Sequence, residues 1–471
     1  MNNSFNKNIS SLVFSTIFCA ILSFLLGVLS RRFLLPEEYG LWMSVSLIFL
    51  YGPLSHLGVI NSINILLPRY ISNMEDINIA KILFHARKVL IYNTIVITSI
   101  AIISLLFTKN NLIFLSIIYV VIQNYYLYYA AYYSASNNFV TVSKIQTYNS
   151  IMSFIISIVL IDLLNVYSLI LGLILSNLIC IYLYRRKYIT KSKDLVFSIR
   201  YFKILINIGL PLLLTSITWT FFTTIDRLFI INYMSLEELG FYSIPIFMFQ
   251  TLMLIPQAYS RVLYTRFNSL YFHKEKRLVL LKEVISSSNV ITYIILLIFG
   301  LAYLNLPFFT ELIFPNYMEG VNAGRTILIG IVFLSMIWVF IVGLNSLEKQ
   351  KYVLLFTIIG ILISILLNFT FIEGGITGIA LATSLTGIIF FIMLSSYFFI
   401  VLKTPIFLII RYYLKSLVTI GTFYFITIKL SDFENIFLNS IIYILLLITS
   451  VILFEFRVVK ELIKSRRNYA K

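Results

Sequence analysis

Long apolar runs alternate with short polar segments along the whole of this 471-residue chain. Most runs are roughly 20 residues long, which is the length that an α-helix needs to cross the hydrocarbon core of a bilayer. A membrane β-barrel would instead show segments of about ten residues with alternating polarity. The pattern predicts fourteen transmembrane helices, at residues 9–29, 41–65, 89–107, 112–133, 147–164, 166–184, 204–231, 239–260, 286–306, 323–344, 352–372, 376–400, 405–428 and 435–455.

The composition places most of the chain in lipid. Hydrophobic residues make up 60% of it and charged residues only 12%, with a mean hydropathy of +0.96. A water-soluble domain of this length cannot bury that much apolar surface, so we expect an all-α polytopic membrane protein. Cys19 and Cys180 lie inside apolar runs, and the sequence contains no CxxC, HExxH or P-loop pattern. We therefore expect no enzyme activity, no metal site and no cofactor.

The net charge of +17 is explained by membrane topology. If the N-terminus lies inside, all but six of the 36 Lys and Arg residues fall on the inner side or in inner helix ends. The six that fall outside or near outer helix ends are Arg31, Arg32, Lys109, Arg227, Arg325 and Lys429. This is the positive-inside rule, which predicts that both termini are cytoplasmic and leaves no reason to expect a nucleic-acid partner.

One short motif occurs twice, 200 residues apart. Residues 36–42 and residues 236–242 both contain Glu-Glu-x-Gly followed by an apolar and an aromatic residue. Six predicted spans separate the copies, so both halves have the same orientation in the membrane. We expect two six-helix lobes in a pseudo-two-fold arrangement about the membrane normal, and glutamates that order the loops and start the next spans. The predicted parts are an N-terminal lobe (1–184), a cytoplasmic basic linker (185–203), a C-terminal lobe (204–402), an appended helix pair (403–456) and a basic cytoplasmic tail (457–471).

The seventh predicted span carries an intramembrane polar stripe. If this helix is continuous, Trp219 and Asp226 share one face with neighbouring threonines, and Arg227 lies beside them. Charged side chains inside a membrane usually line a wet cavity or pair with another group. Two interpretations stay open, a cavity lining and a structural ion pair at a helix end. Arg32 is the corresponding cation at the end of the first span.

Other polar residues also have two interpretations each. Gln250 and Gln257, seven residues apart in the eighth span, suit sugar hydroxyls and suit interhelical hydrogen bonds equally. Tyr125 and Tyr129 belong to a tyrosine-rich fourth span and either stack on sugars or pack within the protein. His56 follows Gly52-Pro53, which should break the second span, and it is either a proton carrier or a hydrogen-bonded packing residue.

The inner segment 261–285 carries Leu278, Leu280, Leu281 and Val284 after a charged stretch. Such a pattern favours a helix lying on the inner membrane surface. A solvated loop is the alternative.

Several motifs, in order, resemble a known family. They are Leu35–Trp42 with Leu57–Val59, then Gly209–Pro211, Asp226–Leu228, Glu237–Ser243 with Leu254–Pro256, and finally Gly375–Thr383. The set resembles the polysaccharide transporters of the multidrug/oligosaccharidyl-lipid/polysaccharide exporter superfamily, which includes O-antigen and capsule flippases. The resemblance extends over residues 8–455, nearly the whole chain.

The resemblance implies a flippase of the bacterial inner membrane. Such proteins move an undecaprenyl-pyrophosphate-linked oligosaccharide from the inner to the outer leaflet by rocking two lobes around a cationic cavity. The implied partners are this substrate, membrane lipid, H⁺ or Na⁺ as a driving ion, and a polysaccharide polymerase or chain-length regulator. The extra helix pair would hold the lipid tail in a groove.

The implied sites follow from the chemistry of that substrate. Arginine offers a fork of donors to pyrophosphate oxygens, so Arg32, Arg227 and Arg325 are the expected pyrophosphate ligands. The expected glycan ligands are Gln250, Gln257, Trp219, Tyr125 and Tyr129. Asp226 and His56 are the candidates for ion coupling.

Two alternative functions are open at this stage. A drug or cation antiporter of the same superfamily would usually have twelve spans, so the appended pair argues against it. A polytopic polysaccharide polymerase would need a long outer loop with catalytic charges, and the predicted outer loops are short. A membrane scaffold without transport activity does not account for the polar helix faces.

Overall fold

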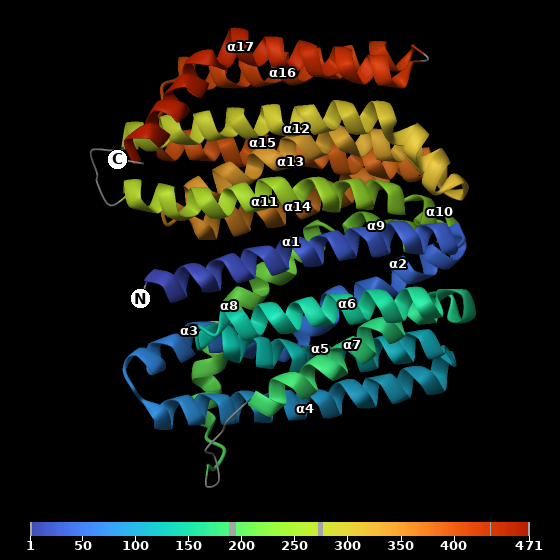
Figure 1. The fold of residues 1–471 in the computed structure, drawn as a ribbon, viewed down its shortest axis with the longest axis vertical. Helices are drawn as coiled ribbons and strands as arrows, with labels where there is room; N and C mark the ends of the chain where they lie inside the picture. The colour runs from blue at the N-terminus through green and yellow to red at the C-terminus, as the bar shows by residue number, and fades with distance from the viewer. Residues whose placement is uncertain (1, 188–194, 272–276, 434, 470–471) are drawn as a thin grey trace. The chain divides into compact units, whose positions relative to one another are not determined.

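The structure is a computed structural model of the chain, in which residues 2–187, 195–271, 277–433 and 435–469 are described. Side chains are described for residues 11–107, 109–185, 195–268, 278–433 and 435–452. Within these residues every regular element is a helix, and none is a strand (Figure 1). The predicted all-α class is confirmed, and the protein is a multi-pass membrane protein.

The helices long and apolar enough to cross a membrane number eleven among the described residues, or twelve if one bent pair counts as a span. One of the eleven, Gln350–Val401, contains two helices that pack against each other, α14 (Gln350–Phe371) and α15 (Gly375–Val401). In the last helix, α17 (Ile436–Tyr469), the segment Ile436–Ile452 is apolar but shorter than these spans. Each of the fourteen predicted spans overlaps a helix, but the count of fourteen is not confirmed.

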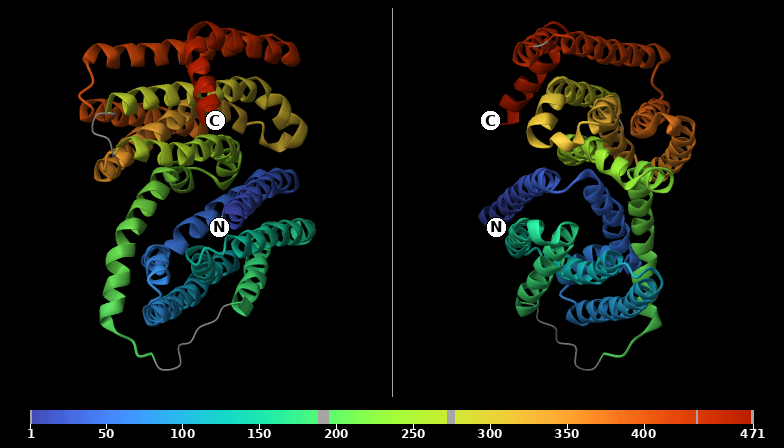
Figure 2. Two further views of the ribbon diagram at one scale, coloured as in Figure 1. Left: turned by 60° about the vertical axis from the view of Figure 1, so that its left-hand side comes forward. Right: turned by 90° about the vertical axis from the view of Figure 1, so that its right-hand side faces the viewer.

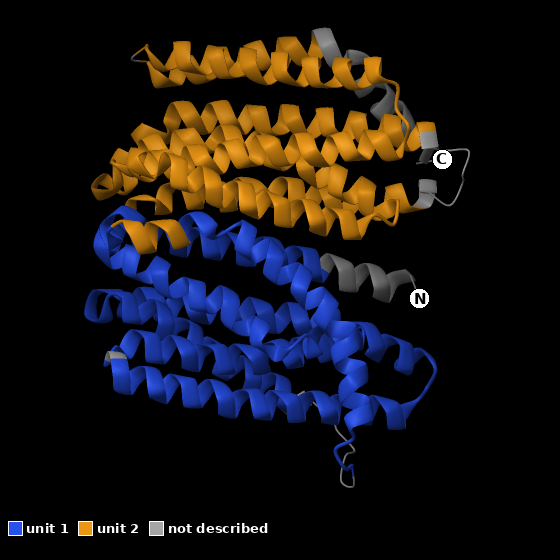
Figure 3. Cartoon of the chain, turned by 180° about the vertical axis from the view of Figure 1, so that it is seen from behind, with its two compact units in different colours: residues 1–227, 235–240 blue, residues 228–234, 241–471 orange. Residues whose placement is uncertain are grey.

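The chain divides into two compact units (Figure 3). Unit 1 contains residues 1–227 and 235–240, and unit 2 contains residues 228–234 and 241–471. These units do not test the lobes predicted from the repeat, residues 1–184 and 204–402, whose boundaries stay a prediction. The predicted linker 185–203 lies partly outside the described residues, and the side chains of the predicted tail 457–471 lie wholly outside them.

Unit 1 is organised around α5, which packs against α3, α4 and α7. Helix α6 packs against both α1 and α7, and α8 packs along α3. The helices of unit 1 are α1 (Asn2–Phe33), α2 (Pro36–Tyr51), the 3-10 helix η1 (Gly52–His56), α3 (Val59–Ser72), α4 (Asp76–Thr108), α5 (Asn111–Ala135), α6 (Phe139–Leu164), α7 (Val166–Lys187) and α8 (Ile199–Phe222). Two further short helices, α9 (Ile225–Tyr233) and α10 (Leu236–Phe241), each have residues in both units.

Unit 2 is organised around α13, which is buried along most of its length and packs against α11, α12 and α15. The last two helices, α16 and α17, lie side by side and both contact α12 (Figure 2). The remaining elements of unit 2 are α11 (Ser243–Tyr271), α12 (Arg277–Ile313), η3 (Pro315–Tyr317), α13 (Gly320–Ser346), η4 (Ile372–Gly374), α16 (Ile406–Ser431) and α17 (Ile436–Tyr469).

The second span is broken at the predicted position. Helix α2 ends at Tyr51, and η1 begins with Gly52-Pro53, because proline cannot continue the hydrogen-bond ladder. Leu57 and Gly58 then adopt left-handed backbone angles, with φ of 54° and 78°, and the chain bends by 48° before continuing as α3. Gly58 lies so close to the backbone of Gly209 in α8 that a Cβ would collide with it.

The structure corrects two expectations. The seventh span is not one helix, because α8 ends at Phe222 and α9 begins at Ile225, so one continuous stripe cannot join Trp219 to Asp226. The predicted surface helix is also absent from the described part of residues 261–285, since α11 continues to Tyr271 and α12 starts at Arg277. There the apolar residues Leu280, Leu281 and Val284 are buried along the first turns of α12.

Candidate functional site

Asp226 and Arg227 are buried at the start of α9, immediately after the helix break. Their exposed fractions are 6% and 5%. The backbone N–H of Arg227 donates to Asp226 Oδ1 at 2.8 Å, while Arg227 Nε has no hydrogen-bond partner among the described residues. Because a buried charge without full compensation is costly, this guanidinium is poised to gain from an anionic partner.

The two helix breaks of unit 1 meet at a hydroxyl contact. The phenol oxygen of Tyr51, at the end of α2, lies 2.5 Å from Thr224 Oγ1, between α8 and α9. Asp226 and Arg227 are near enough to act electrostatically on the same phenol. This region therefore joins two irregular backbone segments, a buried cation and a carboxylate, as binding sites on broken membrane helices do.

His56 is buried and takes part in the break of the second span. Its Nδ1 accepts a hydrogen bond of 3.0 Å from the backbone N–H of Gly58. In this conformation Nδ1 therefore carries no proton, and the ring stabilises the left-handed turn. The packing interpretation accounts for this geometry, and ion coupling through His56 stays a prediction.

The arginine pair at the end of α1 separates into two environments. Arg31 is 4% exposed, donates from Nη1 to the carbonyl oxygen of Gly27 at 2.6 Å, and stacks its guanidinium 4.5 Å from the ring centroid of Tyr39. Arg32, the predicted pyrophosphate ligand, has an exposed side chain. Arg31 therefore fixes local structure, and Arg32 remains available to a ligand.

The second glutamate in each copy of the repeated motif caps its own helix, as predicted. Glu38 Oε2 accepts from the backbone N–H of Leu35 at 2.9 Å, and Glu238 Oε2 accepts from that of Ser235 at 2.9 Å. Ser235 Oγ in turn accepts from the backbone N–H of Glu238, which completes a capping box. Neither glutamate needs a substrate to explain its position.

Sequence reasoning missed an amide network in the interior of unit 1. Gln123 Oε1 on α5 accepts from Asn177 Nδ2 at 2.5 Å, and Asn177 Oδ1 accepts from Asn149 Nδ2 at 2.6 Å. Nearby along α5, Asn124 donates to Ser55 Oγ at 3.0 Å. Asn149 and Asn177 could have been found as isolated amides inside apolar runs, which signal helix–helix hydrogen bonds in membranes.

The predicted glycan ligands lie in separate surroundings rather than in one group within either unit. Tyr129 is buried in the apolar core of unit 1, whereas Tyr125 is half-buried and its hydroxyl accepts from Thr94 Oγ1 at 3.4 Å. Trp219 is half-buried beside Phe222. In unit 2, the side chain of Gln250 is exposed and that of Gln257 is half-buried. Their roles stay predictions.

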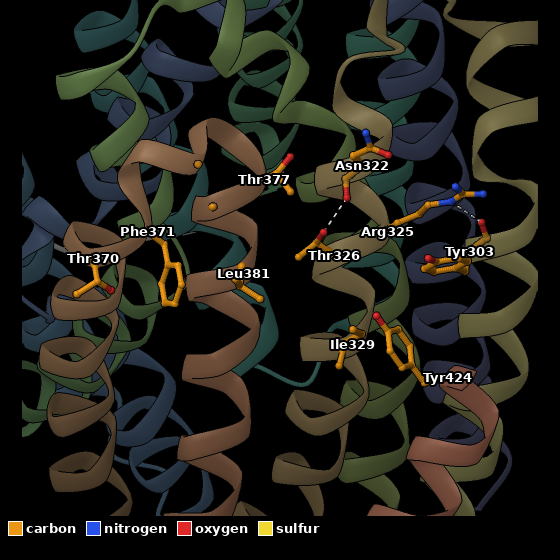
Figure 4. A pocket seen from close by; sticks show the side chains of 12 residues that line it. Tyr303, Asn322, Arg325, Thr326, Ile329, Thr370, Phe371, Thr377, Leu381 and Tyr424 are labelled. Carbon is orange, nitrogen blue, oxygen red and sulfur yellow. Dashed lines mark hydrogen bonds between the residues drawn. The ribbon is translucent and has the colours of Figure 1, made fainter. Parts of the chain in front are cut away.

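Arg325 lies in a cavity of about 700 Å³ that is formed entirely by unit 2 (Figure 4). Its Nε donates to the carbonyl oxygen of Tyr303 at 3.1 Å, and its guanidinium lies 4.7 Å from the centroid of the Tyr303 ring. Five helices contribute to the walls. The lining residues are Tyr303, Asn322, Arg325, Thr326, Ile329, Thr370, Phe371, Gly374, Thr377, Gly378, Leu381 and Tyr424.

The candidate sites in the described residues thus consist of cations and hydrogen-bonding groups. Among the described residues, no group of three or more His, Cys, Asp or Glu side chains could hold a metal ion. Of the three predicted arginines, Arg325 lines the cavity of unit 2 described above.

The fold is shared with solved transporters. A lipid II flippase, MurJ, in an inward closed conformation superposes with a TM-score of 0.74 at 15% identity, covering 95% of this chain and 99% of that one. An inward-facing multidrug resistance transporter of the MATE family, in the MOP superfamily, gives 0.66 at 13% identity, covering 82% and 94%. A mutant form of the Vibrio cholerae MATE transporter VcmN gives 0.56 at 13% identity, covering 85% and 98%.

These solved structures are of transporters, not enzymes, and at such identities they establish the fold alone. Comparison with curated proteins gave no match. A family model described as "polysaccharide biosynthesis protein" matches residues 28–314, which is more than half of the chain. The chain therefore belongs to the polysaccharide biosynthesis protein family and has the fold of the flippases and multidrug transporters of the MOP superfamily.

Proposed function

We propose that the protein is a flippase that moves an undecaprenyl-pyrophosphate-linked oligosaccharide from the inner to the outer leaflet of the bacterial inner membrane. It works by alternating access between two lobes, with both termini in the cytoplasm, and an ion gradient of H⁺ or Na⁺ drives it. Membrane lipid surrounds it, and a polysaccharide polymerase with its chain-length regulator receives the product.

The observation that carries this proposal is the joint result for family and fold. The family model ties the chain to polysaccharide biosynthesis, and the solved flippase shares the fold over nearly the full length of both chains. The MATE structures cover only 82–85% of this chain while 94–98% of their own length is matched. Part of this chain therefore has no counterpart in the matched multidrug transporters.

The buried Arg227 supplies the chemistry for a pyrophosphate. A buried guanidinium whose Nε lacks a partner is destabilised, and it gains charge-assisted hydrogen bonds when an anion reaches it. Arg32 and Arg325 act on the same substrate from exposed and cavity-lining positions. Asp226, next to Arg227, is the first candidate for coupling substrate movement to an ion.

Deletion of the gene tests the function directly. We expect the lipid-linked repeat unit to accumulate on the cytoplasmic leaflet, which glycan labelling of right-side-out and inverted vesicles distinguishes. Accumulation on the outer leaflet, with unchanged surface polymer, would contradict a flippase. An antiporter of drugs or cations, which the MATE fold makes the second candidate, would instead show a changed resistance to cationic dyes and normal polymer.

The site is tested by Arg227→Ala and Arg227→Lys at normal protein level. We expect Arg227→Ala to abolish polymer export and Arg227→Lys to restore only part of it, because lysine lacks the planar donor fork. Lys109→Gln, at the exposed end of α4, is the matched control and should export normally. Wild-type export from Arg227→Ala would remove Arg227 from the substrate path.

A further inference from the structure

The lining of the cavity around Arg325 combines one charged side chain with uncharged hydrogen-bonding groups and aromatic rings. Arg325 is its single ionised side chain, and hydroxyl or amide groups come from Asn322, Thr326 and Thr377. Tyr303 and Tyr424 add aromatic rings with polar tips. A volume of about 700 Å³ lies within the range of about 300–1,000 Å³ typical of small-molecule sites.

The guanidinium of Arg325 is held in place by neutral groups, and no carboxylate is paired with it among the described residues. One nitrogen, Nε, donates to the Tyr303 carbonyl oxygen, and the stack on the Tyr303 ring fixes the plane of the group. The acid closest to Arg325 along the chain is Glu319, at the start of α13. Glu373 lies beside the lining residue Gly374, and Asp432 acts electrostatically on Tyr303. The two terminal nitrogens therefore remain for an anionic oxygen.

The cavity occupies the end of unit 2 where three helix connections gather. Arg325 lies in the second turn of α13, Gly374 lies between α14 and α15, and Tyr424 lies near the end of α16. The α14–α15 corner is tight, since Gly375 has a φ of 59° and a Cβ at Gly378 would fall on the carbonyl oxygen of Phe371. With cytoplasmic termini, this is the extracytoplasmic end.

The appended helix pair completes the cavity wall. Tyr424 belongs to α16, which packs against α12, and its ring faces the cavity with that of Tyr303 (Figure 4). A chain that ended after α15 would lack this wall. The cavity is thus a feature of the extended fold, formed within unit 2 alone.

We infer that the Arg325 cavity is an extracytoplasmic subsite for an anionic saccharide, with the negative group on the Arg325 guanidinium and the sugar hydroxyls on Asn322 and Thr326. The inference rests on the proposed flippase function and names the part of its substrate that unit 2 holds on the outer side. The negative group comes either from a sugar phosphate or from the carboxylate of an acidic sugar. The binding chemistry is the same for both.

Site-directed labelling of the full-length protein tests the inference without requiring transport. Both native cysteines are buried, so Thr377→Cys introduces one accessible thiol into the cavity. In right-side-out vesicles we expect a neutral, membrane-impermeant maleimide to label it. Glucose 1-phosphate or glucuronic acid should slow labelling at least fivefold, and glucose should not. Protection by the phosphate alone assigns the charge to the pyrophosphate linkage, and protection by glucuronate alone assigns it to an acidic sugar.

The controls are placed in the same unit. Combined with Thr377→Cys, Arg325→Gln should remove the protection, and Lys429→Gln, an exposed cation of α16 outside the cavity, should keep it. If Arg325→Gln does not reach the membrane, Asn322→Ala gives the second measurement, with weaker protection expected. The inference is overturned by labelling only from the inner side, by equal protection from glucose, or by protection that survives both Arg325→Gln and Asn322→Ala. The proposed function is tested separately, by the leaflet on which the lipid-linked repeat unit accumulates in the deletion strain, so failure of one proposal is distinguished from failure of the other.

Discussion

Gly40 and Gly240 lie in equivalent positions of the repeated motif, and each packs against the backbone of the other copy. A Cβ at Gly40 would fall on the carbonyl oxygen of Leu236, and a Cβ at Gly240 would fall on the carbonyl oxygen of Pro36. The contact is therefore reciprocal, as expected for surfaces related by a two-fold axis. Each copy of the motif thus has two structural functions. Its second glutamate caps its own helix, and its glycine leaves room for the backbone of the other copy.

We expect Gly40→Ala and Gly240→Ala to destabilise the protein by about 1–3 kcal/mol each, the usual cost of overpacking. The colliding atoms are backbone carbonyls, which cannot rotate away as a side chain would. Thermal unfolding of the purified protein in detergent measures the effect as a lower midpoint.

Gly421 in α16 is the matched control, because a Cβ there would meet nothing within 4 Å. Alanine is favoured over glycine inside a helix by about 1 kcal/mol, so Gly421→Ala should leave the midpoint unchanged or raise it. If all three variants unfold alike, the contact between the motif copies does not limit the stability.

The helical class and the break at Gly52-Pro53 were accessible from sequence because each depends on local chemistry. Lipid demands long apolar helices, and proline removes a backbone donor. The break between α8 and α9 carries no such signal. There Thr223 Oγ1 and Thr224 Oγ1 donate to the carbonyl oxygens of Trp219 and Thr220, and hydroxyls do the same in many unbroken helices.

The candidate sites were less accessible, since they depend on which side of a helix meets its neighbours. Arg31 and Arg32 are adjacent and project about 100° apart, so the sequence could not tell which one the fold buries. The Arg325 cavity draws Tyr303 from 22 residues before and Tyr424 from α16, far along the chain. Only the packing of α12 against α13 and α16 brings both rings to the cavity that holds Arg325.

Substitution of the two arginines of α1 should separate structure from transport. We expect Arg31→Ala to lower the thermal midpoint, because it removes the hydrogen bond to Gly27 and the stack on Tyr39. The exposed Arg32→Ala should fold normally and reduce polymer export. We therefore expect the lower thermal midpoint for Arg31→Ala and the lower polymer export for Arg32→Ala, with both quantities measured for each variant. A reversed order would mean that Arg31, not Arg32, meets the substrate.

His56→Asn distinguishes a packing histidine from a proton carrier. The asparagine Oδ1 can accept the hydrogen bond from the Gly58 N–H much as Nδ1 does, but it does not titrate. If the ring serves packing, His56→Asn should keep export, and His56→Leu, which removes the acceptor, should lower the midpoint. Folded His56→Asn protein without export would instead assign ion coupling to this residue. Export of surface polymer from chromosomal variants is the measurement.

The docking of α17 on α12 depends on a tyrosine seated against a glycine. The Tyr443 hydroxyl donates to the carbonyl oxygen of Leu296 at 2.6 Å, and its ring occupies the place of a Cβ at Gly300. Tyr443→Phe should cost about 1 kcal/mol, the usual net value of one hydrogen bond. Gly300→Ala should cost more, because the ring itself must move.

Cross-linking measures this docking directly. Asn305 Nδ2 donates to Ser440 Oγ at 3.0 Å, so the pair Asn305→Cys and Ser440→Cys joins α12 to α17 when the helices are docked. We expect efficient disulfide formation in the parent, little change with Gly421→Ala, and a clear loss with Gly300→Ala. Undiminished cross-linking in Gly300→Ala would place the attachment of α17 elsewhere along α12. Because α16 contacts both α12 and α17, a shift of α17 should also move Tyr424, and with it the wall of the Arg325 cavity.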